Sequence, residues 1–464
     1  MSGRLSYNFF THMTAVHTSY GYWRKPGNEY TAANYPKMQP WIDLAKGLEA
    51  GFFDTLFIGD TLGPYDVYRN DPYEGIRSGA QFPSNDPSVL VSALASHTEH
   101  LGFTITSSVL QSHPFEFARR MSTLDHLSNG RVGWNIVTSY LDSAARNLGR
   151  DTLPPEGERY DMADEYVDVV YKLWEQSWDD KSKVLDPERN MIFDPDLIHK
   201  INHVGKYFKC EGPHMVEPSP QRTPVLFQAG GSPRGKDFAA KNAEVTFCGA
   251  HSPAFAAAEI AELRQKAVAH GRRAEDILTI VIMAPVIGST EDEAKRKYDE
   301  LIEYADYEAV ATNFVARAPI GGIEPGMVIS DILADPDAVG LSEKINFRAP
   351  MLISMLSGVP DKSITFKDWM LRFYYGGLRF PGTPEQIADK IEQWADAGAT
   401  GINLTPVFTL GWIEEWNEHV VPILHKRGLL QREYAPGTLR EKLFGKAATL
   451  PDYHAARQFR LPVA

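Results

Sequence analysis

The sequence lacks the features that would place it outside the cell or in a membrane. Only two of its 464 residues are cysteine, Cys210 and Cys248, which fits a reducing compartment better than an oxidising one. The first residues contain no basic stretch followed by a long apolar run, as a secretory signal would. No run of about 18 apolar residues occurs, so no segment is predicted to span a bilayer. We expect a cytoplasmic protein without a membrane partner.

Positive charge is scarce relative to negative charge. The chain has 47 Lys and Arg residues against 60 Asp and Glu residues, which gives a net charge of −13. Nucleic acids and anionic membranes repel a chain of this sign, so neither is an expected partner. The 43% hydrophobic and 23% charged residues are typical of a soluble globular protein and exclude disordered and collagen-like classes.

Several short catalytic motifs are also missing. The sequence has no G-x-S-x-G, H-E-x-x-H or C-x-x-C pattern, so the usual signals of acyl hydrolysis, zinc proteolysis and thioredoxin-type redox chemistry are absent. The pairs His12 with His17 and His199 with His203 have gaps that could suit a metal, but no cysteine or carboxylate completes either set. We therefore expect no metal.

Short apolar runs alternate with helical patterns along most of the chain. The strand-like runs span 5–10, 54–60, 101–109, 132–139, 224–230, 244–249, 279–288 and 401–408. Helical patterns lie between them, at 41–50, 87–98, 113–131, 160–175, 253–269, 382–398 and 411–426. This order predicts an α/β protein, a (β/α)8 TIM barrel, because an open sheet of eight strands more often breaks into two domains.

The segment 382–398 has the sequence signals of a complete amphipathic helix, from its N-cap to its C-terminal end. Thr383 can cap it and Pro384 suits the first helical position. Gly398 follows its end, and its apolar stripe consists of Ile387, Ile391, Trp394 and Ala395.

Two long stretches do not follow the alternation. We interpret 177–222 and 307–378 as insertions in a single domain of residues 1–464, and the second as a lid. The C-terminal extension, 428–464, is too polar for a core and too patterned for disorder. We expect it to pack on the barrel or on a second subunit.

Polar residues follow the strands, where barrel enzymes place their active sites. Asp60 ends one strand and could orient a ligand, act as a base or cap the next helix. Gly231 and Ser232 lie in a glycine-rich turn between a strand and a helix, where backbone N–H groups favour a phosphate. The turn lacks the dinucleotide and Walker spacings, so phosphate binding and a plain tight turn both stay open.

Beyond these patterns, the sequence resembles the bacterial-luciferase superfamily. The resemblance rests on the segments WRKP, FDTLFIGD, YDVYR, PSNDP, HPFEFARRMSTLDHLSNGRVGWNIVTS, ERYDMADEY, EPSPQRTPVLFQAGGSPRG and LREKLFGK. It runs from about residue 5 to 456, except for 307–378. The matching branch is that of two-component flavin monooxygenases acting on nitrilotriacetate, dibenzothiophene sulfone, dimethyl sulfide and long-chain alkanes.

The resemblance implies a barrel that holds FMN at its C-terminal mouth. Its flavin contacts would be Asp60, Thr106, Asn135, Tyr160, Gly231 and Ser232, with Ser232 on the phosphate side. The catalytic candidates are His17, Tyr140 and Asn313, with His17 placed to hydrogen-bond the peroxide or the substrate. The substrate pocket would include Phe10, Thr14, Tyr65 and Gln81.

The sequence departs from the resembled enzymes at several of these positions. Glu156 stands where relatives have a flavin-contacting histidine, four residues before Tyr160. Thr14 replaces a cysteine of the alkane enzymes, and Tyr140 and Asn313 replace pocket histidines. These changes argue against a plain alkane hydroxylase.

The activity implied by the resemblance is a monooxygenation of the flavin C4a-peroxide type that uses reduced FMN and O2. A separate NAD(P)H-dependent flavin reductase would supply the reduced flavin, and the enzyme would be a homo-oligomer, a dimer or tetramer. A ring-containing substrate is expected from aromatic candidates for the cavity wall: Phe9, Phe10, Tyr20, Tyr22, Tyr65, Trp134 and Tyr140.

Other activities stay open. An oxidative lyase of the same superfamily could cleave a large heteroaromatic such as riboflavin. A flavin-free phosphate-binding barrel could act as a hydrolase or aldolase through Asp60 and another carboxylate. A non-catalytic flavin carrier and a deazaflavin-dependent dehydrogenase are further alternatives.

Overall fold

The structure is a computed structural model that describes residues 4–248, 252–316, 320–341, 349–375, 377, 379–405 and 411–460. Within these ranges, no helix has both the length and the apolar character needed to cross a membrane.

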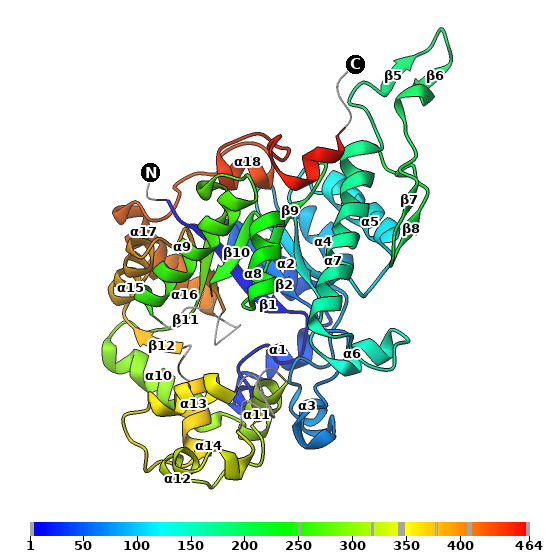
Figure 1. Cartoon of the computed structure of the whole chain (residues 1–464). Coiled ribbons are helices and arrows are strands. Elements are labelled where there is room, and N and C mark those ends of the chain that lie inside the picture. Colours follow the sequence, from blue (N-terminus) through cyan, green and yellow to red (C-terminus); the bar gives the residue numbers. More distant parts are fainter. Residues whose placement is uncertain are drawn as a thin grey trace.

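Eight parallel strands form a closed barrel (Figure 1). They are β1 (Ser6–His12), β2 (Thr55–Gly59), β3 (Gly102–Ser108), β4 (Val132–Val137), β9 (Val225–Gln228), β10 (Val245–Cys248), β11 (Leu278–Ile287) and β13 (Gly401–Leu404). Their order is β10-β9-β4-β3-β2-β1-β13-β11, and pairing of β10 with β11 closes the ring. The predicted TIM barrel and its eight strands are confirmed; residues 406–408 of the last predicted strand lie outside the described residues.

One short strand of the sheet was not predicted. β12 (Arg379–Gly382) pairs in parallel with Ala284–Ile287, the C-terminal half of β11, outside the closed ring. Its four residues include a proline and a glycine, so they give no strand pattern of their own. Tertiary pairing with β11 makes this segment extended.

Helices surround the barrel (Figure 1). The principal ones are α2 (Met38–Ala50), α4 (Pro87–Ala95), α5 (Pro114–Leu127), α7 (Glu156–Tyr171), α8 (Pro233–Asn242), α9 (Pro253–Ala269), α10 (Glu291–Tyr304), α15 (Pro384–Asp396), α16 (Trp412–Glu415) and α17 (Val421–Arg427). The cap predicted for α15 is confirmed, because the Thr383 side chain accepts from the N–H of Gln386 in a capping box. Its predicted core residues Ile387, Ile391 and Trp394 are buried.

Two predicted helices contain a wider, π-helical turn. Lys172–Gln176 (η3) follows α7, and Trp416–Val420 (η8) separates α16 from α17. The rings of Trp412 and Trp416 stack at 5.2 Å across the start of η8. The regular helical spacing read from the sequence could not anticipate these insertions in the helical repeat.

Short elements connect the barrel units at the C-terminal end of the strands. They are η1 (Tyr22–Arg24) and α1 (Glu29–Asn34) after β1, η2 (Tyr68–Asn70) and α3 (Tyr73–Ser78) after β2, and α6 (Asp142–Asn147) after β4. A further turn, η5 (Ala274–Asp276), precedes β11.

The two stretches interpreted as insertions have different structures. Residues 177–222 contain the hairpins β5 (Lys183–Asp186) with β6 (Met191–Phe193) and β7 (His203–Val204) with β8 (Lys209–Cys210), besides η4 (Pro195–Leu197). The β5–β6 hairpin projects away from the barrel (Figure 1).

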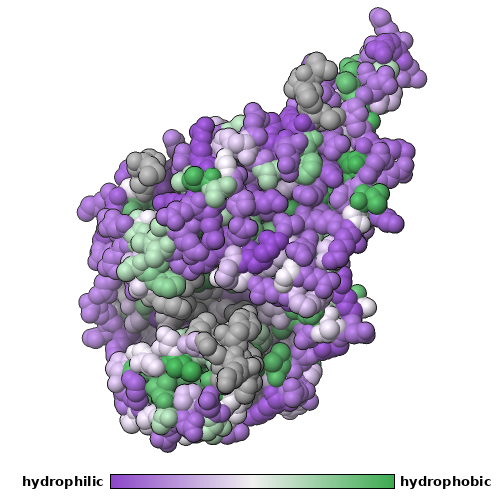
Figure 2. All heavy atoms as spheres, in the orientation of Figure 1, coloured by the Kyte–Doolittle hydropathy of each residue, from purple (hydrophilic) through white to green (hydrophobic). Residues whose placement is uncertain are grey.

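Residues 307–378 are largely helical where they are described. They contain α11 (Tyr307–Val315), α12 (Ile329–Ala334), η6 (Asp337–Val339), α13 (Ala349–Ser357), α14 (Phe366–Trp369) and η7 (Met370–Tyr375). This group lies at the same end of the barrel as α1, α3 and α6 (Figure 1). The surface is hollowed between the group and the barrel (Figure 2). That the group acts as a lid stays a prediction.

The C-terminal extension packs against the opposite, N-terminal end of the barrel. It contains α18 (Leu439–Phe444) and η9 (Ala455–Phe459). Leu439 joins a buried cluster with Phe57, Val225, Phe227, Val245 and Ile280 from the strands. Arg440 forms an ion pair with Glu244, in which Nε lies 2.7 Å from Oε1 and Nη2 lies 2.9 Å from Oε2. Both side chains are almost fully buried.

Candidate functional site

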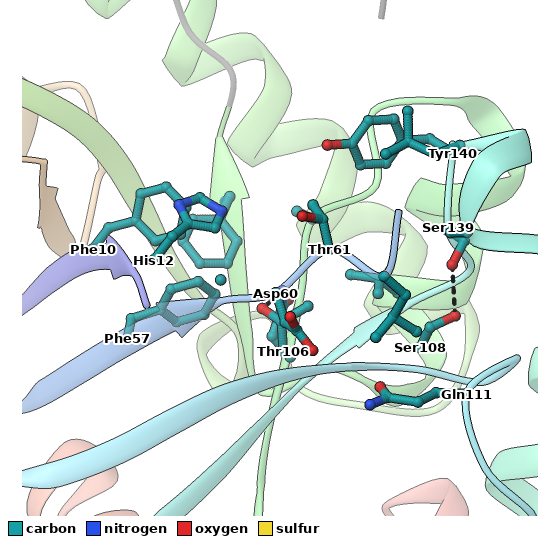
Figure 3. Close-up of a pocket in the computed structure, with 18 of the residues that line it drawn as sticks. Phe10, His12, Phe57, Asp60, Thr61, Thr106, Ser108, Gln111, Ser139 and Tyr140 are labelled. Carbon is teal, nitrogen blue, oxygen red and sulfur yellow. Dashed lines mark hydrogen bonds between the residues drawn. The ribbon is translucent and has the colours of Figure 1, made fainter. Parts of the chain in front are cut away.

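A cavity of about 260 Å³ opens at the C-terminal mouth of the barrel. Figure 3 shows its two sides: Phe10, His12 and Phe57 lie together at one side, and the hydroxyl and amide groups of Ser108, Gln111 and Ser139 lie at the other. Asp60 and Thr106 lie between them (Figure 3). An elongated molecule with one apolar ring face and several polar edge atoms would match such a lining.

The polar side includes a buried amide that lacks one partner. The Asn135 Nδ2 donates to Thr106 Oγ1 at 3.0 Å, across the neighbouring strands β3 and β4. Its Oδ1 is buried and accepts no hydrogen bond from any residue that the structure describes. Ser108 and Ser139 share a hydrogen bond of 2.8 Å beside it. Because a buried acceptor without a partner is costly, the Asn135 oxygen indicates that a donor group belongs in this cavity.

Asp60 is held in a largely buried position at the end of β2. Ser84 Oγ donates to its Oδ1 at 3.3 Å. Burial first, and then the negative charge of Asp86, raise the pKa of Asp60 to about 6 from the usual 3.8. The carboxyl is therefore close to half protonated at mildly acidic pH, where it can donate or accept a hydrogen bond.

This pKa predicts a pH-dependent gain in stability for Asp60→Asn. A carboxyl whose pKa is higher in the folded state destabilises the fold above that pKa, and the effect disappears as pH falls toward the unfolded value. At about 1.4 kcal/mol per unit, we expect Asp60→Asn to raise the free energy of unfolding by about 1–3 kcal/mol at pH 8. Urea unfolding should show little gain at pH 4. The exposed Asp151→Asn is the control, and an equal gain at both pH values would contradict the prediction.

The glycine-rich turn between β9 and α8 forms a second polar region. Ser232 caps α8, and its Oγ accepts from the N–H of Gly235 at 3.1 Å. A Cβ on Gly235 would lie 2.6 Å from the Tyr160 hydroxyl, whereas a Cβ on Gly231 would meet no described residue within 4 Å. Gly235 is therefore required by close packing, and Gly231 leaves open space in front of the helix.

Tyr160 ties α7 to this turn. Its hydroxyl interacts with the side chains of Ser232 and Gln228, and burial followed by the charge of Glu156 raises its pKa. The Gln228 Oε1 is buried without a hydrogen-bond partner among the described residues. Arg234 lies over the Tyr160 ring at 5.6 Å. Arg234 also pairs with Asp164. Hydroxyl and amide groups thus converge at the start of a ten-residue helix, where backbone N–H groups favour a phosphate.

Four residues predicted for the site meet in one hydrogen-bonded cluster. The Tyr65 hydroxyl donates to Gln81 Oε1 and shares a hydrogen bond of 2.7 Å with Tyr140. Asn313 Nδ2, from α11, donates to Tyr65 at 3.2 Å. Tyr374 donates to Asn313 Oδ1 at 3.4 Å. The cluster links the group 307–378 to the barrel mouth, across 248 residues of sequence.

His12 lines the mouth cavity, and His17 lies behind His12, outside that cavity. The two Nδ1 atoms are 2.7 Å apart, and His17 Nε2 is 2.8 Å from Thr405 Oγ1. Burial, then the charges of His12 and Arg379, hold the pKa of His17 well below its usual 6.5. His17 therefore stays neutral at physiological pH and positions the ring of His12.

Two smaller cavities adjoin the larger one. One of about 120 Å³ shares Phe10 and Ile282 with it and is also lined by Tyr20, Gln81 and Asn313. The other, of about 230 Å³, shares His12 and is also lined by Thr14 and His17. Thr14 thus faces the far side of the histidine pair.

Several sequence-based candidates lie elsewhere. Phe9 packs against Phe53 and Trp412, and Trp134 packs against Phe117, between the barrel and its helices. Successive strand residues point to opposite faces, so Phe10 and Asn135 face the barrel interior and their neighbours do not. Tyr22 packs against Tyr304.

The mouth cavity also lacks some of the residues predicted to bind the flavin. Ala229 lines it, but Tyr160, Gly231 and Ser232 are not among its lining residues. Sequence reasoning did not single out Phe57, Gln111 or Arg379 as site residues. Phe57 points into the barrel, because alternate residues of β2 do so. No local sequence feature distinguishes Gln111 or Arg379.

Comparisons with known proteins agree with this geometry. The family model described as luciferase-like monooxygenase matches residues 18–335. The chain is 40% identical over 464 residues to dimethyl-sulfide monooxygenase from Hyphomicrobium sulfonivorans, covering 99% of this chain and 94% of the relative. It is 39% identical over 465 residues to long-chain alkane monooxygenase from Geobacillus thermodenitrificans, covering 99% of each.

A solved structure adds a flavin-containing relative. The crystal structure of riboflavin lyase with modified FMN and its substrate riboflavin matches with a TM-score of 0.83 and 30% identity. The match covers 99% of this chain and 100% of that one.

Proposed function

Because the chain belongs to the luciferase-like monooxygenase family, we propose that it is an FMN-dependent monooxygenase that uses reduced FMN and O2 to oxygenate a small organic, ring-containing substrate. The observation that carries the proposal is the mouth cavity, with aromatic rings on one side and the unpartnered Asn135 oxygen on the other. Two-component monooxygenases of this family use reduced flavin and O2.

The residues at the barrel mouth fit FMN. Asp60, Thr106 and Asn135 would face the polar edge of the flavin ring, where ring N–H and carbonyl groups need partners of both kinds. Ser232 and Tyr160 would hold the phosphate at the start of α8, over the open space at Gly231. When bound in its reduced form, the flavin supplies the electrons that activate O2.

The chain's own side chains would position the substrate and exclude water. Since the two Nδ1 atoms of His12 and His17 lie in hydrogen-bond contact, one of them carries the shared proton and the pair fixes the His12 ring at the cavity wall. The Tyr65 cluster ties the group 307–378 to the barrel, which favours a site shielded from solvent. Tyr140 belongs to this cluster and also lines the mouth cavity.

A separate NAD(P)H-dependent flavin reductase would supply the reduced FMN. The branch of the family that the chain matches includes monooxygenases named as one component of a two-protein system, which supports this partner. We expect a cytoplasmic homo-oligomer, whose size gel filtration with light scattering would determine.

Oxidative cleavage of a large heteroaromatic such as riboflavin is the second candidate. The similarity to the riboflavin lyase structure and the aromatic wall formed by Phe10 and Phe57 favour it. The size of the 120 Å³ cavity beside the mouth favours a smaller substrate.

The decisive experiment is an oxygen-uptake screen. The purified protein, FMN, NADH and an added flavin reductase are incubated with ring-containing acids, sulfur heterocycles, alkanes and riboflavin. Substrate-dependent oxygen uptake with an oxygenated product is the expected result, and riboflavin cleavage would favour the second candidate. Absence of FMN binding would overturn the proposal and favour a flavin-free barrel, whereas binding without any reaction with O2 would favour a deazaflavin enzyme or a flavin carrier.

Ser232→Ala should weaken FMN binding by about tenfold. Removing one hydroxyl that hydrogen-bonds a charged phosphate costs about 1.5 kcal/mol. Fluorescence titration of FMN measures the effect. Ser252→Ala is the matched control, because Ser252 caps α9 in the same way, with its side chain accepting from the N–H of Phe255. Equal FMN affinity of the two variants would remove the phosphate assignment.

A further inference from the structure

The 120 Å³ cavity beside the barrel mouth has a mixed lining. Its aromatic part comprises Phe10, Tyr20, Tyr374 and Tyr375, and its polar part comprises Thr18, Gln81, Asn313, Arg379 and Thr405. Phe10 and Ile282 also line the larger cavity, so a molecule in the smaller one would adjoin the proposed flavin site. Among its lining residues, Arg379 alone carries a formal charge at neutral pH.

Arg379 is a buried cation that forms no ion pair with any of the described residues. It is 7% exposed and begins β12, where it pairs with Ala284 of β11. Its Nη2 donates to the Thr18 carbonyl at 2.7 Å, and its Nη1 donates to the Tyr375 carbonyl. The guanidinium also lies over the Tyr375 ring, 4.0 Å from its centre.

One nitrogen of this guanidinium makes no hydrogen bond to the described residues. This nitrogen is the buried Nε, which has no hydrogen-bond partner in the part of the chain that the structure describes. Throughout the described ranges, no aspartate or glutamate forms an ion pair with Arg379. The carbonyl groups that it contacts are neutral, so its charge is solvated in part but not neutralised.

A buried charge of this kind destabilises the protein unless a counter-ion neutralises it. Buried guanidinium groups normally pair with carboxylates or phosphates, because removing a charge from water without compensation costs several kcal/mol. The field of Arg379 also reaches the histidine pair, since its charge contributes to the lowered pKa of His17. An anion beside Arg379 would offset both effects.

We propose that the substrate is an organic acid whose carboxylate or sulfonate pairs with Arg379 inside this cavity. The inference rests on the proposed function and specifies its substrate class. The planar guanidinium suits a two-oxygen anion, and the tyrosine rings suit an apolar or aromatic body.

The size of the cavity limits that body. An apolar cavity of about 150 Å³ can hold benzene. The cavity of about 120 Å³ is smaller, so it accommodates the acid group and only part of a six-membered ring, with the remainder extending toward Phe10 and the proposed flavin.

The test compares charged and neutral probes of the same shape in the flavin-free protein. Isothermal titration calorimetry at low ionic strength would measure the affinities of benzoate, benzenesulfonate and the neutral benzamide. We expect the two anions to bind at least about tenfold more tightly than benzamide, with an affinity that falls as salt is added. Equal binding of benzoate and benzamide would overturn the proposal.

Variants assign the preference to Arg379. Arg379→Gln should abolish the preference for anions, and Arg379→Lys, which keeps the charge, should restore part of it. Arg372→Gln is the matched control, because Arg372 is exposed on the neighbouring η7. If Arg379→Gln fails to fold, Arg379→Lys and the salt dependence still test the proposal. A preference for anions that changes neither in Arg379→Lys nor with added salt would contradict it.

The outcome is separable from that of the proposed function. Probe binding is measured without flavin, so a protein that never reacts with O2 can still show the preference for anions. Conversely, oxygenation of neutral compounds with no preference for anions would leave the monooxygenase in place and remove this inference.

Discussion

Arg440→Met is expected to lower the free energy of unfolding by about 3–5 kcal/mol, because it leaves the Glu244 carboxylate buried without its partner. The two side chains are 3% and 5% exposed, and their contact is bidentate. Arg440 also donates to the carbonyls of Gln221, Thr223, Pro224 and Ala448. It thereby holds the C-terminal extension against the N-terminal end of the barrel.

Chemical denaturation at neutral pH measures this loss. Lys295→Met is the control, since Lys295 pairs with Asp299 on the surface and such pairs contribute about 0–1 kcal/mol. Arg440 holds the pKa of Glu244 below its usual value despite burial. In Arg440→Met this pKa should therefore rise, and the stability deficit should shrink as pH falls and Glu244 takes up a proton. A loss below about 1 kcal/mol would show that the extension does not depend on this pair.

His17→Ala is expected to lower kcat for substrate oxygenation by about 100-fold, the loss that a small misplacement of a group at the reacting centre can cause. The variant removes the Nδ1 partner of His12 and the contact with Thr405, so the His12 ring is no longer fixed at the cavity wall. FMN affinity should change little, because His17 does not line the mouth cavity. The ratio of product formed to O2 consumed should fall.

A purely structural role for His17 would give a different pattern. His17→Gln keeps a hydrogen-bonding amide and should recover part of kcat, whereas a folding defect would lower stability and FMN binding in both variants. His419→Ala, at an exposed position on η8, is the control. Because His17 stays neutral, its removal should not change the position of a pH–rate midpoint near 6, to which Asp60 is the expected contributor. Unchanged kcat in His17→Ala would reject the positioning role.

The sequence determined the strands, the principal helices and the polar ends of the strands. A barrel strand is apolar on both faces, because helices cover one face and the barrel interior covers the other. Each of the eight strands is therefore an apolar run in the sequence, which is why all eight could be predicted. Local chemistry also sufficed for the α15 capping box and for the glycine-rich turn before α8. In each case the determining residues are close together in the chain.

Only the tertiary structure decided which side chains meet. Tyr65, Tyr140 and Asn313 form one cluster because α11 returns to the barrel mouth, and no spacing in the sequence encodes that contact. Which of the two histidines lines the mouth cavity also depends on the fold, since His12 faces it and His17 lies behind His12. Arg379 begins a segment without strand character, which becomes extended by pairing with β11, and its side chain is buried there. Local patterns fix elements through short-range sterics and periodicity, whereas the charge balance of a cavity depends on residues hundreds of positions apart.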